Sequence, residues 1–300
     1  MSRLFEALQK SEPEFSFEFP LAMQLTDEPL KAAKTESPQK PAEKFERNQR
    51  AKRDSALAPA PAQQLPSVPV VIKPDIRLVC LTQKDSLAAE KFRFLAVRLS
   101  QLQQDRAVKK LLVTSTIPEE GKSMISANLA LSLVRKKRQR ILLLEGDLRR
   151  PTLCESFGLR NLPGVSEWLK SGSCKITNVY HIDEAGLWFL PAGSLPENPM
   201  ELIQSGRLAE LMEQLTLRFD WIVIDSPPVL PVADTSVWSR LADSILLVAR
   251  EGTTKKRELR RGLEMLDHSK VLGLVLNSSE SIDQGNLALR SGFGLGAGQN

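Results

Sequence analysis

The sequence contains little tyrosine, little cysteine and no long apolar run. Tyr180 is the only tyrosine in 300 residues, and the three cysteines, Cys80, Cys154 and Cys174, show no C-x-x-C spacing. Zinc and redox sites commonly use that spacing, so its absence disfavours both and fits a reducing cytoplasm. No apolar run approaches the roughly 18 residues that cross a bilayer, and the first residues lack the apolar core of a secretory signal. We therefore expect a soluble, cytoplasmic protein that reaches the inner face of the membrane only through a partner.

The excess of positive charge is also small. The chain has 41 Lys and Arg residues against 36 Asp and Glu residues, which gives a formal net charge of +5. Nucleic-acid-binding proteins usually show clustered positive charge with interleaved aromatic residues. A basic group at 255–261 could bind polyanions, as in DNA-partitioning ATPases, but a solvated surface is the simpler interpretation. Nucleic acid is therefore not an expected partner.

Proline is concentrated in the first part of the chain, and this predicts how the chain is divided. Ten of the nineteen prolines precede position 75, and residues 12–77 are charged and rich in Pro and Ala. Such a composition cannot bury enough apolar surface to order itself, so we expect a disordered linker. Residues 1–11 can form a short amphipathic helix, which is either a frayed terminus or a docking segment. Residues 278–300 predict a flexible tail, which leaves 78–277 for a folded domain.

Short apolar runs alternate with longer helical patterns within 78–277. The predicted strands are 111–114, 140–144, 187–190, 221–224, 244–248 and 271–276, and the predicted helices are 85–104, 122–136, 198–216, 233–241 and 254–268. Apolar runs without polar alternation are typical of parallel strands that are buried on both faces. We therefore predict an α/β fold with a doubly wound, mostly parallel sheet and helices on both faces. Ligands of such sheets bind at the carboxyl ends of the strands.

One predicted strand is followed by a phosphate-binding loop. The segment from Ser115 to Ser123 reads STIPEEGKS and joins that strand to a helix. A helix N-terminus offers backbone N–H donors and the positive end of its dipole to a triphosphate. Gly121 lets the backbone approach the phosphates, Lys122 can reach the β- and γ-phosphates, and the Ser123 hydroxyl can ligate Mg²⁺. The sequence therefore predicts a P-loop for a nucleotide triphosphate with Mg²⁺, although Thr116 stands where the usual first glycine would be.

Acidic residues follow two further predicted strands. Glu145 and Asp147 come after the apolar run ILLL, and Asp225 follows the run WIVI. The carboxyl ends of neighbouring parallel strands lie near the P-loop, where a Mg²⁺ shell and a hydroxyl-activating base are needed. Mg²⁺ keeps several waters, so one carboxylate from each strand end is enough. Each acid alone would more simply be a surface or capping residue, but together with a P-loop they predict a phosphoryl-transfer site.

With these motifs, the sequence resembles the bacterial tyrosine kinases (BY-kinases) of the CpsD/CapB type, which share the MinD/ParA-like class of P-loop ATPase fold. The resemblance covers about residues 78–277. Its motifs are the loop S-x-x-P-x-E-G-K-S (Ser115, Pro118, Glu120, Gly121, Lys122, Ser123), the second acidic motif (Asp147, Arg149, Arg150, Pro151), D-x-P-P (Asp225, Pro227, Pro228) followed by Asp234, the segments PAG (191–193) and NPMEL (198–202), and VLGLVLN ending at Asn277. Together these motifs are far more specific than a P-loop alone.

The resemblance implies a non-specific protein-tyrosine kinase that transfers the γ-phosphoryl of ATP to tyrosine and regulates exopolysaccharide or capsule synthesis and export. The implied catalytic residues are Lys122, Glu145, Asp147 and Asp225, with Glu145 or Asp147 orienting or deprotonating the incoming hydroxyl. The implied Mg²⁺ ligands are Ser123, Asp147 and Asp225. The implied nucleotide-binding residues are Ser115, Glu120, Gly121, Lys122, Ser123, Met124 and Asn277. Asn277 would contact the adenine, unless it only caps its own loop.

The resemblance also implies partners. The activator would be a membrane protein of the chain-length-determinant type from a polysaccharide export system, and the substrate would be a protein tyrosine in trans. The predicted helix at 85–104 resembles the family's oligomerisation helix with the pattern E-x-x-R-x-x-R, in which Glu90 and Arg93 match but Ala96 replaces the second Arg. A ring-shaped homo-oligomer is therefore an expectation that this partial match leaves open.

Two features depart from the family pattern. Glu145 occupies a position where the family has Asp, and its extra methylene advances the carboxylate by about 1.5 Å. Gly146, where Ala is usual, could give the backbone room to compensate. The tail at 278–300 lacks the tyrosine cluster that neighbouring subunits phosphorylate in the family, and Tyr180 is most simply a partly buried structural residue. Autophosphorylation of the tail is thereby excluded, so either another protein carries the acceptor or the ATP site is a switch.

Two alternatives to a kinase follow from these departures. The ATP site could act as a conformational switch in a scaffold of the export machinery, as the tyrosine-free tail suggests. A positioning ATPase of the MinD/ParA type is less favoured. Those proteins usually place a second lysine early in the P-loop, where this chain has Thr116, Ile117 and Pro118.

Overall fold

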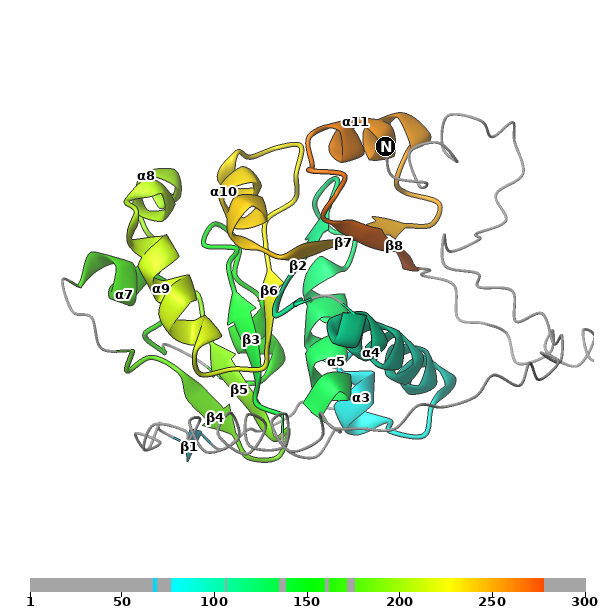
Figure 1. Ribbon diagram of the computed structural model, residues 1–300, viewed down its shortest axis with the longest axis horizontal. Helices are drawn as coiled ribbons and strands as arrows, with labels where there is room; N and C mark the ends of the chain where they lie inside the picture. The colour runs from blue at the N-terminus through cyan, green and yellow to red at the C-terminus, as the bar shows by residue number, and fades with distance from the viewer. Residues whose placement is uncertain are drawn as a thin grey trace, which may run out of the picture.

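One mixed, mostly parallel sheet runs through the centre of the domain (Figure 1). The computed structural model describes residues 67–68, 77–105, 107–134, 139–159, 162–171 and 176–277. The predicted helix at 1–11, nearly all of the predicted linker at 12–77 and the predicted tail at 278–300 lie outside these residues. The structure therefore describes most of the predicted domain.

The sheet confirms the predicted doubly wound, mostly parallel architecture. Its strands among the described residues are β1 (Ser67–Val68), β2 (Lys110–Ser115), β3 (Ile141–Glu145), β4 (Tyr180–Ile182), β5 (Leu187–Leu190), β6 (Trp221–Asp225), β7 (Ser244–Arg250) and β8 (Val271–Asn277). Their order across the sheet is β1-β4-β5-β3-β6-β2-β7-β8. Every neighbouring pair is parallel except β4 with β5. The P-loop strand β2 therefore lies between β6 and β7, and β3 lies on the far side of β6.

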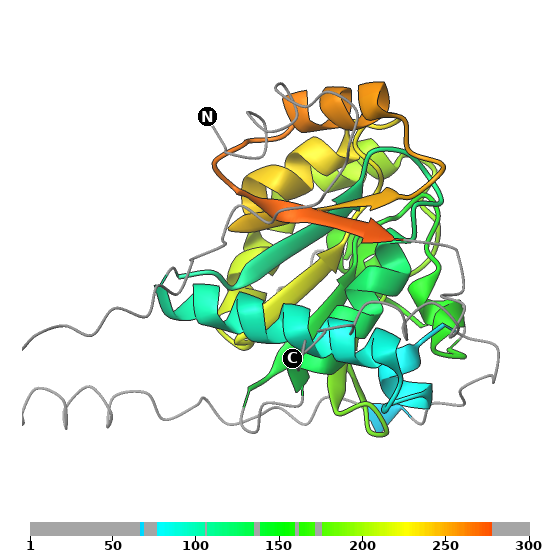
Figure 2. The ribbon, with the colours of Figure 1, turned by 90° about the vertical axis from the view of Figure 1, so that its right-hand side faces the viewer.

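Helices cover both faces of this sheet, as Figure 2 shows. They are α3 (Val79–Thr82), α4 (Leu87–Asp105), α5 (Lys122–Val134), α6 (Leu153–Ser156), α7 (Val165–Lys170), α8 (Pro199–Gln204), α9 (Arg207–Thr216), α10 (Asp234–Leu241) and α11 (Lys256–Glu264). Apolar side chains of α3 to α6 share one core with the sheet, and those of α7 to α11 share the other. In the described part of the chain, no helix combines the length and the apolarity needed to cross a bilayer.

The two cores explain why the central strands are continuously apolar. In β2, Leu111 and Val113 belong to the core under α5, whereas Leu112 between them belongs to the opposite core. Successive side chains of a strand point to opposite faces, so a strand that is covered on both sides needs apolar residues at every position. The uninterrupted run is therefore the sequence pattern that places β2 at the centre.

Two predicted helices end differently in the structure. The prediction of one helix at 198–216 is wrong, because α8 and α9 are separated by Ser205 and Gly206. Gly206 has φ +80°, a left-handed conformation that an α-helix cannot contain. The predicted helix at 254–268 is shortened to α11, and the short strand β4 went unpredicted because three residues give too little pattern.

Gly206 offers a clean test of backbone conformation. A Cβ at this position would meet no atom within 4 Å, so an alanine there would suffer only from the left-handed backbone. We expect Gly206→Ala to lower the free energy of unfolding by about 1 kcal/mol and Gly206→Asn to lower it less, since Asn tolerates this conformation. Urea denaturation monitored by tryptophan fluorescence would measure both. Gly252 has φ +72° and equally open surroundings, so Gly252→Ala should behave alike. Unchanged stability of both alanine variants would contradict this account.

Candidate functional site

The predicted P-loop is the turn between β2 and α5. Its backbone passes through left-handed conformations at Glu119 (φ +66°) and Gly121 (φ +89°). A side chain at Gly121 would also collide with the amide group of Asn277, so only glycine fits there. The helix begins at the next residue, Lys122, and its first backbone N–H groups have no acceptor within the helix. The turn therefore provides the donors that a phosphate group needs.

Glu120 holds this loop together from inside. Its side chain is fully buried, and its carboxylate accepts hydrogen bonds from the backbone N–H groups of Thr116 and Ile117 at 2.7 and 3.0 Å. The hydroxyls of Thr116 and Thr254 donate to the same carboxylate. The Thr116 methyl group lies against α11, because a Cβ at Gly262 would collide with it. Thr116 thus makes contacts that a glycine could not make, and the carboxylate of Glu120, predicted to bind nucleotide, is engaged by the loop itself.

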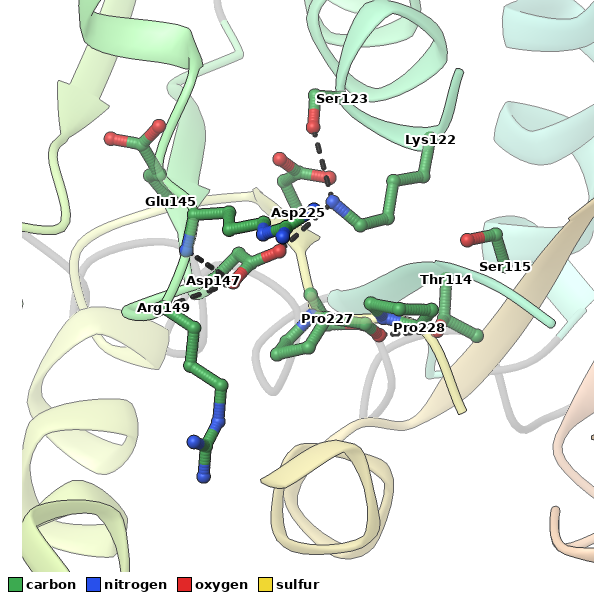
Figure 3. Close-up of polar contacts among 12 residues, drawn as sticks. Thr114, Ser115, Lys122, Ser123, Glu145, Asp147, Arg149, Asp225, Pro227 and Pro228 are labelled. Carbon is green, nitrogen blue, oxygen red and sulfur yellow. Dashed lines mark hydrogen bonds and ion pairs between the residues drawn. The ribbon is translucent and has the colours of Figure 1, made fainter. Parts of the chain in front are cut away.

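Lys122 lies among acidic and hydroxyl groups at the start of α5 (Figure 3). Its Nζ atom is 3.1 Å from Oδ2 of Asp147 and 3.4 Å from Oγ of Ser123. Burial lowers the pKa of the ammonium group, but the negative charges of Asp225 and Asp147 outweigh burial, so its pKa lies above the ordinary value. The lysine therefore carries its charge throughout the physiological pH range.

Asp225 is buried at the end of β6, directly beside the P-loop strand. In the sheet register it pairs with Val113 of β2 on one side and with Glu145 of β3 on the other. Burial raises the pKa of its carboxyl group, while the charge of Lys122 and a hydrogen bond from Ser123 oppose that rise. The hydroxyl of Ser126, one turn further along α5, donates to Oδ1 at 3.3 Å. The predicted convergence of strand ends is therefore present.

Glu145 points away from Lys122 and Asp225 in Figure 3. Its two carboxylate oxygens accept hydrogen bonds from the backbone N–H groups of Leu153 at 2.6 Å and Ala192 at 3.1 Å. Burial raises the pKa of this carboxyl group from 4.5 to about 7, although the two backbone donors oppose that rise. The longer side chain thus connects the end of β3 to α6 and to the segment after β5. The expectation that Glu145 orients an incoming hydroxyl finds no support in this orientation.

Gly146 makes room for a tryptophan. A Cβ at Gly146 would lie 2.9 Å from two ring atoms of Trp238 and 3.0 Å from the carbonyl oxygen of Asp225. The N–H group of Gly146 donates to that same carbonyl oxygen at 2.7 Å. The glycine was expected to compensate for the length of Glu145, but the space that it leaves is filled by the indole of α10.

Asp147 begins a turn that is held in place by a contact between Arg149 and Asp234 of α10. Its Oδ1 atom accepts hydrogen bonds from the backbone N–H groups of Arg149 at 3.2 Å and Arg150 at 3.0 Å, while Oδ2 faces Lys122. The guanidinium group of Arg149 donates to both oxygens of Asp234, at 2.7 and 3.0 Å. Asp234 is fully buried at the start of α10. A bidentate pair of this kind fixes orientation as well as charge, so the turn that carries Asp147 is anchored to α10.

Three further predicted nucleotide-binding residues lie around the loop. The buried hydroxyl of Ser115 donates to the carbonyl oxygen of Ile117 at 2.8 Å. Asn277 ends β8, and its Nδ2 donates to the carbonyl oxygen of Glu120 at 3.0 Å. Met124 is partly buried in the first turn of α5. Asn277 therefore caps the P-loop rather than its own loop, and its contact with adenine stays a prediction.

The residues present suit a magnesium–nucleotide complex. The loop donors and Lys122 match phosphate oxygens, and the oxygens of Ser123 and Asp225 are the hard ligands that Mg²⁺ prefers. Within the part of the chain that the structure describes, no group of three His, Cys, Asp or Glu side chains is arranged to hold a metal ion alone. Mg²⁺ would therefore depend on phosphate and water oxygens, as is usual in phosphoryl-transfer sites.

Several side chains that hold the site were not assigned a role from the sequence. Ser126 lies three residues after Ser123 and so on the same face of α5, which is a signal that helix periodicity could have supplied. Thr254 follows the carboxyl end of β7, where the strand-end rule also applies. The packing of Trp238 on Gly146 has no sequence signal, because only the fold brings α10 next to the residue that follows β3.

No protein-family model matches this chain. Tyrosine-protein kinase YwqD of Bacillus subtilis (strain 168) is 33% identical over 205 residues, which are 68% of this chain and 86% of YwqD. Tyrosine-protein kinase ptk of Acinetobacter johnsonii is 31% identical over 215 residues, which are 71% of this chain but only 29% of ptk. This chain therefore corresponds to most of the first relative and to under a third of the second.

A solved structure agrees with these relatives. The crystal structure of the chimerical protein CapA2B2 matches with a TM-score of 0.63 and 32% identity, over 71% of this chain and 94% of that one. The matched length, the relatives' names and the three converging motifs confirm the predicted resemblance. The chain belongs to the family of bacterial tyrosine-protein kinases.

Proposed function

We propose that this chain is a protein-tyrosine kinase that uses ATP and Mg²⁺ to phosphorylate a tyrosine of another protein. The observation that carries the proposal is the position of Lys122 between Asp147 and Ser123 at the mouth of a P-loop. Membership of the tyrosine-kinase family supports the acceptor chemistry. When bound, magnesium–ATP supplies the γ-phosphoryl group and neutralises charge on the phosphates.

The chain's own residues then act by position and charge, as is usual for phosphoryl transfer. The donors of the P-loop and the ammonium of Lys122 hold the phosphates, and Ser123 and Asp225 provide oxygens for the metal. Asp147 is the acid best placed to orient or deprotonate the acceptor hydroxyl, because its Oδ2 atom lies 3.1 Å from Lys122 Nζ. Glu145 holds the frame of this site through its two backbone contacts.

The acceptor lies on another protein. Tyr180, the only tyrosine of the sequence, is 8% exposed, and its hydroxyl donates to the carbonyl oxygen of Pro163 at 3.1 Å. A membrane protein of the chain-length-determinant type in a polysaccharide export system is the proposed activator, and it would recruit the chain to the inner face of the membrane. Regulation of exopolysaccharide or capsule synthesis and export is the corresponding proposed role.

Assembly into a ring-shaped homo-oligomer is a further part of the proposal. Glu90 and Arg93 on α4 form an ion pair with each other, and Ala96 is buried in the core of the domain. The residue that replaces the family's second Arg therefore does not lie at the surface. Exposed apolar side chains of α4, Leu87, Phe94 and Val97, leave a surface on which copies could associate.

A nucleotide switch without phosphotransfer is the second candidate. It is favoured by the tyrosine-free sequence of the tail and by the hydrogen bonds of the P-loop to Asn277 of β8 and to Thr254 just before α11. The switch predicts partner association that depends on ATP and persists without transfer. A positioning ATPase has no comparable observation in its favour.

Lys122→Met should abolish the transfer. Incubation of the chain with radiolabelled ATP, Mg²⁺ and a tyrosine-bearing activator tail should give phosphotyrosine, and the Lys122→Met variant should lower the yield at least about 100-fold because a preorganised positive charge is lost. Phosphoamino-acid analysis would measure this. Tyr180→Phe serves as the control and should leave the yield unchanged. ATP binding without transfer under any activation would sink the kinase proposal and leave the switch.

Substitutions of Asp147 and Glu145 should have different effects on the rate of phosphoryl transfer. Asp147→Asn should lower kcat at least about 100-fold with little change in the KM for ATP, since it removes a group that acts in the transition state. Glu145→Gln should keep kcat within a few-fold of the wild type. Steady-state rates with saturating acceptor would decide. If Glu145→Gln were the inactive variant, the assignment would have to be reversed.

Glu145 should also make stability depend on pH. Its pKa is about 7 in the folded chain against an ordinary 4.5, so folding favours the protonated form. The stabilisation is complete below pH 4.5 and is lost as pH rises through about 7, which corresponds to roughly 2.5 kcal/mol between pH 5 and pH 8. Urea denaturation across this range should show the loss in the wild type but not in Glu145→Gln. Glu155→Gln, at an exposed position of α6, is the control. Parallel pH profiles for wild type and Glu145→Gln would contradict the prediction.

A further inference from the structure

A strongly basic surface lies on α11, outside the phosphate site. It consists of the exposed residues Lys255, Lys256, Arg257, Arg260 and Arg261, here called the basic face. The carboxylate of Glu258, in the first turn, accepts a hydrogen bond from the Lys255 backbone N–H group at 3.1 Å. Glu264 is the exposed carboxylate of the last turn, and Met265 just beyond it is 60% exposed. The basic face therefore carries a net positive charge, and the exposed apolar side chain of Met265 lies beside it.

The opposite side of the same helix packs on the phosphate loop. Leu259 and Leu263 of α11 are buried in the core, and Gly262 between them lies so close to Thr116 that a Cβ would collide with the Thr116 methyl group. Thr254, which precedes the helix, donates a hydrogen bond to Glu120. Figure 1 places α11 above the β7 and β8 side of the sheet, away from α7 to α9. A ligand bound to the basic face would therefore contact a helix that packs directly on the P-loop.

The sequence contains a segment of matching chemistry. Residues 11–30 hold five carboxylates and no lysine or arginine, and they include Phe15, Phe17 and Phe19. Lys31 is the first cation after this segment. The negative charge suits the basic face, and the phenylalanines suit the exposed side chain of Met265, since sulfur–aromatic contacts are favourable. Both properties of the surface thus have a counterpart in this one segment.

We propose that the acidic segment 11–30 of this chain binds the basic face of α11. The connection is long enough, because 36 residues (31–66) separate the segment from β1. As a random coil this length would have an end-to-end distance of about 33 Å. Seven strand spacings from β1 to β8 amount to about 34 Å, so the segment can reach α11 at the other edge of the sheet. Attachment to the same chain raises its effective concentration to the order of a millimolar, which suffices for a weak contact.

Binding of the segment has a consequence for the phosphate loop. The contact of α11 with Thr116, and the hydrogen bond from Thr254 just before the helix to Glu120, transmit any change in the position of the helix to the residues that shape the loop. The segment would also neutralise the cations of the basic face, on the helix that packs on the P-loop, where the polyanion ATP is expected to bind. Displacement of the segment from α11, for example by an anionic competitor, would therefore change the conformation of the P-loop and its affinity for nucleotide.

Photo-crosslinking of the full chain tests the contact directly. p-Benzoylphenylalanine placed at Phe17 should crosslink to the 255–265 region, with Met265 as a favoured acceptor, and peptide mapping by mass spectrometry would locate the product. Reversal of Arg257, Arg260 and Arg261 to Glu should lower the yield at least about fivefold, as should raising the salt to about 1 M. Changing Glu12, Glu14 and Glu18 to Lys in the same chain should restore the yield of the Arg-reversed variant.

Matched controls separate this contact from general charge effects and from other occupants. Reversal of Arg77, Lys84 and Lys91, which are exposed cations elsewhere on the domain, should leave the yield unchanged. Crosslinks that map elsewhere, or that survive reversal of the basic face, would overturn the proposal. So would products that form only between two chains and vanish on dilution. Loss of the crosslink on adding phosphatidylserine vesicles, with equal vesicle binding by the Glu-to-Lys variant, would identify a lipid surface as the occupant instead.

Discussion

An ammonium group with little access to water is the constraint on which the site depends. The side chain of Lys122 is 12% exposed, and a charge at such depth is costly unless opposite charges surround it. Asp147 and Asp225 supply those charges, and they can do so only because β6 lies beside β2 and β3 lies beside β6. The strand order is therefore more than a scaffold. It brings together residues more than a hundred positions apart, such as Lys122 and Asp225, so that their opposite charges compensate each other at the P-loop.

The buried carboxylates of this site perform two different tasks. Glu120 and Glu145 accept hydrogen bonds from backbone N–H groups of segments that are distant or irregular, and Asp234 binds Arg149. These carboxylates fix loops. Asp225 faces the charge of Lys122, and Asp147 does both, because one of its oxygens accepts backbone hydrogen bonds of its own turn and the other faces Lys122. Because buried hydrogen bonds within the protein hold these loops, little reorganisation is needed when charge develops during the transfer, and such preorganisation is a main source of electrostatic catalysis.

Much of this arrangement could be predicted from the sequence. The uninterrupted apolar runs placed β2, β3 and β6 correctly, and the strand-end rule identified Lys122, Asp147 and Asp225 as neighbours. Side-chain direction could not be read in the same way. Glu145 follows its strand as regularly as an active-site acid, yet it turns to Leu153 and Ala192 because those amides come from other segments of the fold. The left-handed Gly206 was hidden by a helical apolar pattern that continues across it. Long-range packing, such as Trp238 on Gly146, has no local signal at all.

The surroundings of the P-loop also bear on how such a kinase would be controlled. The only tyrosine of the sequence, Tyr180, is buried, and its hydroxyl donates a hydrogen bond to the carbonyl oxygen of Pro163. The loop is tied to β8 through Asn277 and to the region of α11 through Thr254 and Gly262, and both elements lie at one side of the sheet. The turn of Asp147, which follows β3, is anchored separately to α10 through Arg149 and Asp234. A ligand on α11 would therefore act on the P-loop through contacts that are separate from those that hold the turn of Asp147.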